Sequence, residues 1–172
     1  PPSTGSRDVV VVAGIANASG DRPIIDRLEA AGWSITVVDD DQLAPAQLTG
    51  AELIVVTSSV VPTKIPAWLA EQPTPLLSSE SYSFTTLKMA TSGRDSTASN
   101  VDITTSPTPV KGALAGRVTV SASTALGSAN PVPSASVVAT LAGQPDNAAV
   151  FTIERGSALT SGTAASRRVG FF

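Results

Sequence analysis

Three short runs of apolar, largely β-branched residues constrain the fold more than any other feature of the sequence. They cover residues 8–13, 34–39 and 51–58, and the first contains four consecutive valines. Continuous apolar runs of this length are typical of strands that are buried on both faces, as they are in a parallel sheet. We therefore predict that the three segments are strands of one parallel sheet.

A helix is predicted between the first two of these strands. Ile24, Ile25 and Leu28 recur at helical spacing. Pro23 suits the first turn of a helix, and Gly32 suits the position at which a helix ends. The order strand, helix, strand is that of a crossover connection between parallel strands.

The segments after the second strand give weaker signals. The expected elements are short helical segments over residues 42–50, 63–71 and 83–89 and a fourth strand over residues 75–78. Pro66 either limits the second helical segment to its first turn or kinks it, because proline lacks the amide hydrogen that a helix interior needs. The first half of the chain thus predicts a βαβαβ arrangement.

The sequence changes character after Thr91. Short strand-like runs are separated there by Gly, Pro, Asn and Asp, with a spacing typical of antiparallel hairpins. Residues 1–7 are rich in Pro and Ser and are expected to be a linker or a tail. We predict a single α/β domain over residues 8–172, in which antiparallel hairpins of the C-terminal half extend the parallel sheet at one side.

Composition excludes several classes of function. The 172 residues include no cysteine and no histidine, so the sequence offers no thiolate nucleophile, imidazole base or zinc site of the usual kinds. The net charge is -3 and the 11 Lys and Arg residues are scattered, which argues against nucleic acid as a partner. The apolar runs are too short to span a membrane. We expect no cofactor and no metal, and the sequence favours a non-enzymatic role.

The loops at the carboxyl ends of the predicted strands are the place where open α/β sheets bind ligands. The candidate ligand-binding residues there are Asn17, Ser19, Gly20, Asp39, Ser58, Ser59 and Glu80. In the first loop, backbone amides at the helix start suit an anion. The favoured alternative is that Asn17, Ser19 and Asp21 cap the helix.

The acidic run Asp39–Asp41 follows the second predicted strand. Three adjacent carboxylates suit a hard cation such as calcium, but no further ligand spacing accompanies them. A solvated turn is therefore the favoured interpretation.

Serine catalysis is a further hypothesis for the same loops. Ser59 or Ser79 as a nucleophile needs a general base, and Glu80 is the only titratable residue nearby. A carboxylate without histidine is a poor base for a hydroxyl, so this hypothesis is disfavoured.

Two tryptophans and an arginine pair are expected to be structural. Trp33 follows the predicted helix and Trp68 lies on the apolar face of a short one, so both are expected to pack in the core or at its edge. Arg167 and Arg168 precede the last predicted strand and are expected to be solvated or paired.

Four longer stretches carry a family resemblance: residues 26–41, 51–60, 136–159 and 167–172. They resemble the flavodoxin-like domain shared by class I glutamine amidotransferase-like and trehalose-utilisation (ThuA-like) proteins, especially as modules of bacterial secreted proteins. The resemblance implies a flavodoxin-like fold more than a function. Catalytic relatives carry a cysteine on a sharp strand-to-helix turn, served by a histidine. Because this sequence has neither, glutaminase activity is not carried over.

The resemblance also bears on the C-terminal strand. In such domains the strand that corresponds to RRVGFF is normally followed by a helix that covers the sheet, whereas this sequence ends at Phe172. We expect apolar surface there, covered by a protein partner, by the rest of a longer chain or by a second copy.

Two functions stay open. The first is a non-catalytic structural or interaction module of an exported or surface protein or assembly. The second is a small-molecule or carbohydrate-associated binding or hydrolytic domain with its site at the strand ends.

Overall fold

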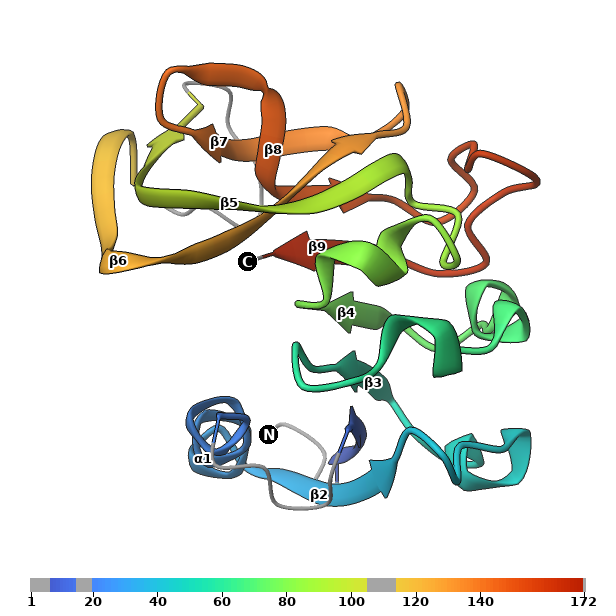
Figure 1. The fold of residues 1–172 in the computed structure, drawn as a ribbon. Helices are drawn as coiled ribbons and strands as arrows, with labels where there is room; N and C mark the ends of the chain where they lie inside the picture. Colours follow the sequence, from blue (N-terminus) through green and yellow to red (C-terminus); the bar gives the residue numbers. More distant parts are fainter. Residues whose placement is uncertain (1–6, 15–19, 105–113, 172) are drawn as a thin grey trace, which may run out of the picture.

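The computed structural model describes residues 7–14, 20–104 and 114–171, which form one nine-stranded sheet (Figure 1). The order of the strands across the sheet is β2-β1-β3-β4-β9-β8-β6-β5-β7. In chain order the strands are β1 (Arg7–Ala13), β2 (Trp33–Asp39), β3 (Leu53–Val56), β4 (Leu76–Ser78), β5 (Ala90–Ile103), β6 (Gly116–Pro131), β7 (Ser136–Leu141), β8 (Gln144–Ile153) and β9 (Arg168–Phe171). Figure 1 shows the parallel strands stacked from β2 at the bottom to β9 in the middle, with the antiparallel strands above them.

The parallel part of the sheet consists of β2, β1, β3, β4 and β9. Val9 and Val11 of β1 pack on the same face as the helix α1 (Arg22–Ala30), while Val10 and Val12 pack in the larger core on the other face. All four side chains are buried, which confirms the prediction made from the valine run. The α/β fold with a parallel N-terminal half is confirmed as well.

The two faces of the parallel strands are covered by different structures. Within the described ranges α1 is the only α-helix, and it packs against β1 and β2. The opposite face is covered by four 3-10 turns: η1 (Pro45–Leu48), η2 (Pro62–Lys64), η3 (Ala67–Glu71) and η4 (Ser81–Phe84). No helix in the described part of the chain is long and apolar enough to cross a membrane.

The helix expected over residues 63–71 is in fact the two separate turns η2 and η3. Pro66 lies between them with an extended backbone (φ -77°, ψ 140°), because its ring and missing amide hydrogen prevent a continuous helix. Ile65 and Leu69 still reach the core, as predicted, and Trp68 packs against the core's edge.

The antiparallel part of the sheet closes on itself. β5 and β6 form a long hairpin, β7 pairs with both β5 and β8, and β8 meets β6 at Ala129 and Ala148. The circuit encloses a small core that includes Val101, Leu126 and Leu141. The predicted extension of the sheet by antiparallel strands is confirmed, whereas the sequence does not predict the closure.

The last strand, β9, joins the two parts, since it runs parallel to β4 and antiparallel to β8. Gly170 of β9 lies opposite Phe151 of β8, and a Cβ at this glycine would lie 2.4 Å from two ring atoms of Phe151. The ring of Phe151 also contacts Phe84 edge to face, with 5.3 Å between the ring centroids. Glycine is therefore required here so that the aromatic pair can pack directly on the β9 backbone.

The prediction that both arginines of the C-terminal pair are solvated or paired is wrong for Arg168. This side chain is 1% exposed, and its guanidinium donates to the carbonyl oxygens of Ala70, Gln72 and Thr74 at 3.1, 2.6 and 3.2 Å. Burial lowers the pKa of Arg168. The neighbouring Arg167 is exposed and pairs with Glu154 at 3.0 Å, as predicted.

Candidate functional site

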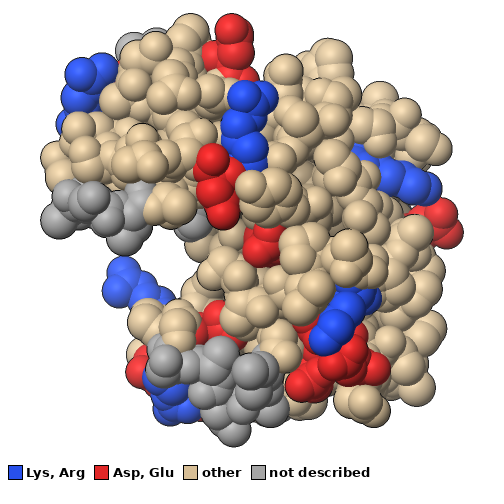
Figure 2. Space-filling model, in the orientation of Figure 1, with Lys and Arg blue, Asp and Glu red and all other residues tan. Residues whose placement is uncertain are grey.

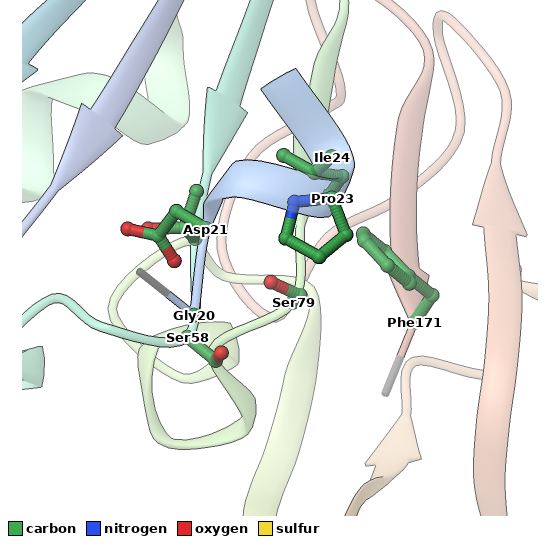
Figure 3. Close-up of a pocket in the computed structure, with 8 residues that line it drawn as sticks. Gly20, Asp21, Pro23, Ile24, Ser58, Ser79 and Phe171 are labelled. Atoms are coloured by element: carbon green, nitrogen blue, oxygen red, sulfur yellow. The ribbon is translucent and has the colours of Figure 1, made fainter. Parts of the chain in front are cut away.

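A cavity of about 210 Å³ lies at the carboxyl ends of β3 and β4, beside the start of α1 (Figure 3). Its lining residues combine polar and apolar side chains: Gly20, Asp21, Pro23, Ile24, Thr57, Ser58, Ser79 and Phe171. In Figure 3 the ring of Phe171 lies beside Pro23, across the cavity from Asp21. We call this cavity the rim pocket, and it lies where open α/β sheets hold ligands.

Some of the ligand-binding residues predicted from the sequence line the rim pocket. Gly20 and Ser58 line it, and so does Ser79, which the sequence offered only as a nucleophile. The predicted residues that do not line it are Asp39, Ser59 and Glu80. Asn17 and Ser19 lie outside the described residues.

Ser59 lies behind the rim pocket in a hydrogen-bond network. Its hydroxyl donates to Asp21 Oδ2 at 2.5 Å and accepts from the Gly14 amide at 3.0 Å. A Cβ on Gly14 would lie 2.0 Å from the Ser59 carbonyl oxygen, so the two loops touch backbone to backbone. The network joins the loops that follow β1 and β3 and fixes Asp21 in place, which is a structural role.

The expectation that Asp21 caps the helix through its side chain is wrong. Asp21 is the N-cap residue of α1, yet its side chain makes no capping hydrogen bond. Its carbonyl oxygen accepts from the amides of Ile24 and Ile25 at 3.1 and 3.2 Å, while its carboxylate binds Ser59. The Asp21 carboxylate thus accepts from the Ser59 hydroxyl of the neighbouring loop instead of from the unpaired amides in the first turn of α1.

The acidic run after β2 is not the solvated turn that the sequence favoured. The side chain of Asp40 is 0% exposed and accepts from the Val61 amide at 2.7 Å. The Lys64 ammonium lies 2.7 Å from Asp41 and 3.3 Å from Asp40, and these pairings, with Asp41 first, raise the pKa of Lys64. The three carboxylates lie within 4.8 Å of one another, and the lysine supplies positive charge there. The cluster thus fastens η2 to the end of β2.

Glu80 is buried under η4, away from the rim pocket. Its side chain accepts from the Tyr82 amide at 3.0 Å, and burial raises its pKa. The hydroxyl of Ser79 is directed instead to the Val56 carbonyl oxygen, at 3.5 Å. The structure therefore does not build the serine–glutamate pair that the sequence left open.

A second cavity, of about 380 Å³, continues from the rim pocket along the α1 face of the sheet. Its lining is almost entirely apolar: Pro23, Ile24, Arg27, Leu28, Leu53, Val55, Leu77 and Phe171. We call it the trough. The signal that predicts it is the alternation of side chains along strands, which places Phe171 and Val169 on the face opposite Arg168.

The surface charge of the protein does not mark a polyanion site. Figure 2 shows lysine, arginine and acidic side chains scattered over the displayed face, most of them beside the opposite charge. The same view shows a deep hollow between the part that contains α1 and the antiparallel strands. The trough is therefore distinguished by its apolar lining rather than by surface charge.

No protein-family model and no curated protein matches the chain. Solved structures do resemble it. One is a protein assigned as a GMP synthase subunit from Thermoplasma acidophilum, at 12% identity and a TM-score of 0.61, over 98% of this chain and 84% of that one. Another is a glutamine amidotransferase from Thermotoga maritima, at 14% identity and a TM-score of 0.63, over 97% of this chain and 75% of that one.

The fold is class I glutamine amidotransferase-like. The resemblance drawn from the sequence is thereby confirmed at the level of the fold. At these identities the likeness establishes the architecture alone. The site of this amidotransferase-like fold must be interpreted from its own residues.

Proposed function

We propose that this chain is a non-catalytic interaction module that binds a helical protein partner through the trough. One observation carries the proposal: a cavity of about 380 Å³ with an apolar lining lies beside α1 on this face of the sheet, where Leu53, Leu77 and Phe171 are only partly buried. The absence of cysteine and histidine, and the structural roles of Ser59 and Glu80, support a module without catalysis. The composition supports a place in an exported or surface protein, and the four stretches of family resemblance support a ThuA-like subgroup.

The size of the trough supports a helix as its occupant. Parallel sheets are ordinarily buried on both faces. Three strands at the usual spacing span roughly 10 Å, which is about the diameter of one α-helix. The helix α1 already packs on the neighbouring strands β1 and β2 of this face. A second helix beside α1 completes the layer.

A second candidate function concerns the rim pocket. Its hydroxyl and carboxylate groups, facing an aromatic ring, are the kinds of group that bind a small polyhydroxylated molecule. Ser58 and Ser79 are the residues that a sugar hydroxyl would meet first.

Binding of an amphipathic peptide tests the first proposal. We expect a fluorescently labelled, stapled helix of about 15 residues with one leucine stripe to bind the protein and to raise its melting temperature. Leu77→Asp should abolish binding, because it places a charge on the floor of the trough. Val120→Asp is the matched control, since Val120 is an exposed apolar strand residue (37% exposed) outside the trough.

The two candidates give separable results. Equal affinity for wild type and Leu77→Asp, with both variants shown to be folded by near-UV circular dichroism, would contradict docking in the trough. A rise in melting temperature with sugars that Ser58→Ala abolishes would instead support the rim pocket.

A further inference from the structure

We infer that β2, the outer strand of the sheet, pairs antiparallel with β2 of a second copy of this chain. The two sheets then become one continuous sheet across a two-fold axis. The inference is independent of the trough, because it concerns the opposite end of the parallel strands. Its partner is the protein itself.

β2 is the end of the sheet at which no further strand pairs, within the part of the chain that the structure describes (Figure 1). At the other end β7 pairs with both β5 and β8, so the antiparallel strands close on themselves. The amide of Asp40, just after β2, donates to the Ala13 carbonyl oxygen of β1 at 2.8 Å. Because backbone groups alternate in direction along a strand, those of Ile35 and Val37 point away from β1, toward the free edge.

The sequence of β2, WSITVVD, lacks the features that usually protect an edge strand. It contains no lysine and no proline, and its register against β1 is continuous, without a bulge. Ile35 and Val37 are only half-buried, because α1 lies mainly over β1. There Ile25 of the helix packs on the buried Val9 and Val11. The edge thus presents partly covered apolar side chains beside backbone groups that are free to pair.

The strand matches itself in one antiparallel register. With Thr36 opposite Thr36 of the second copy, Ile35 lies opposite Val37 and exchanges two hydrogen bonds with it. Apolar side chains of the α1 face then meet apolar ones, while Thr36 and Ser34 lie on the other face. The two copies of α1 lie on the same side, separated by three strand spacings or about 14 Å. Packed helices lie roughly 8–10 Å apart, so the two helices do not collide.

The charges at the two ends of β2 complement each other in this register. The Arg7 guanidinium lies 5.7 Å from the centre of the Trp33 ring, and Arg7 forms no ion pair within the described ranges. At the other end the carboxylates of Asp39–Asp41 lie within 4.8 Å of one another, and Lys64 pairs with the last two. Two-fold pairing places Trp33 opposite Asp39 of the second copy, so Arg7 meets the acidic end across the ring. This match favours a second copy over an unrelated strand.

A disulfide crosslink tests the register, because the chain has no cysteine of its own. Thr36→Cys should form a linked dimer with oxidised glutathione, since opposite residues of a non-hydrogen-bonded pair have Cα atoms about 4.5 Å apart. Ser34→Cys is the matched control, because Ser34 is exposed on the same face of β2. Its two copies lie four residues apart along the paired strands, about 13 Å, which is too far for a disulfide. Non-reducing gel electrophoresis measures both variants.

Exchanged charges test the ends of the strand. Arg7→Glu and Asp39→Lys should each weaken the dimer roughly tenfold, because like charges then meet at both ends. An equimolar mixture of the two variants should dimerise again, since opposite charges meet at both ends of the mixed pair. Arg94→Glu, at an exposed residue of β5, is the matched control and should dimerise like wild type. Sedimentation velocity at about 10–300 µM suits the weak affinity of a small interface.

The other outcomes overturn the inference. A wild type that stays monomeric over this concentration range contradicts pairing through β2, and so does equal crosslinking of Thr36→Cys and Ser34→Cys. A dimer that both charge reversals leave intact, or that the mixture fails to restore, does not use this register. A dimer that Leu77→Asp dissociates and Arg7→Glu does not would place the second copy in the trough. Peptide binding in the trough is measured separately, so failure of the inference and failure of the proposed function are distinguishable.

Discussion

The two faces of the parallel sheet are built from alternate residues of the same strands, yet one face is closed throughout, while the other, here called the open face, is closed only where α1 packs on it. On the closed face Leu76, Phe84 and Phe151 are at most 1% exposed and pack together. On the open face Leu77 and Phe171 line a cavity of about 380 Å³. The closed face therefore contributes more to the stability of the fold, and the part of the other face that α1 leaves partly buried is where we propose binding.

The largest expected effect is on the closed face. Phe151→Ala should lower the free energy of unfolding by about 3–5 kcal/mol, because it removes the ring that packs on Gly170 and Phe84. Val169→Ala on the open face of β9 should cost less than about 1.5 kcal/mol. Urea unfolding measures both variants, and equal costs would contradict the distinction between the faces.

A smaller effect is expected where the closed face is tightest. Gly170→Ala should destabilise the protein by about 1–3 kcal/mol, because the new methyl group overlaps the ring of Phe151. The double variant Gly170→Ala with Phe151→Leu should recover part of this loss by making room. Absence of any coupling between the two substitutions in urea unfolding would count against this packing.

Glu80 gives the closed face a pH dependence. Its folded-state pKa is raised from 4.5 by burial, so its contribution to stability is present below pH 4.5 and is lost as the pH rises through the higher folded value. Glu80→Gln should therefore stabilise the protein at pH 7 relative to wild type and flatten the profile. Urea unfolding at several values between about pH 4 and pH 8 measures this effect, and a variant less stable than wild type at pH 7 would contradict it.

The smallest stability change is expected on the open face. Leu77→Gln should alter the free energy of unfolding by less than about 1 kcal/mol, since its side chain is only partly buried. It should nonetheless weaken the binding of a hydrophobic dye, because it interrupts the apolar trough. Unchanged dye fluorescence would place the exposed apolar surface elsewhere.

The parts of the fold that the sequence predicts are those determined by local pattern. The valine run of β1 and the helical spacing of Ile24, Ile25 and Leu28 each identify their element, because burial on two faces or on one helical stripe leaves a periodic signal. Gly20 and Ser58 are found in the same way, since the carboxyl ends of parallel strands meet at one edge.

The parts that sequence analysis misses depend on contacts between distant residues. Lys64 pairs with the carboxylates of Asp40 and Asp41 across more than twenty positions, and no local pattern predicts that pairing. The charge of Arg168 predicts an exposed side chain. It is buried because the carbonyl oxygens of Ala70 and Gln72, which are distant in the sequence, accept hydrogen bonds from its guanidinium. The closure of β5, β6, β7 and β8 into a circuit depends on strand register, which short polar runs specify weakly.

Hydrogen exchange of the protein with and without the stapled leucine-stripe helix tests the central claim most directly, because it shows which amides the bound helix protects. We expect slowed exchange in α1, β3, β4 and β9, with no change at the Asp39–Asp41 turn or in the circuit of β5, β6 and β7. Protection confined to that circuit, or to the acidic turn, would contradict the trough as the binding surface.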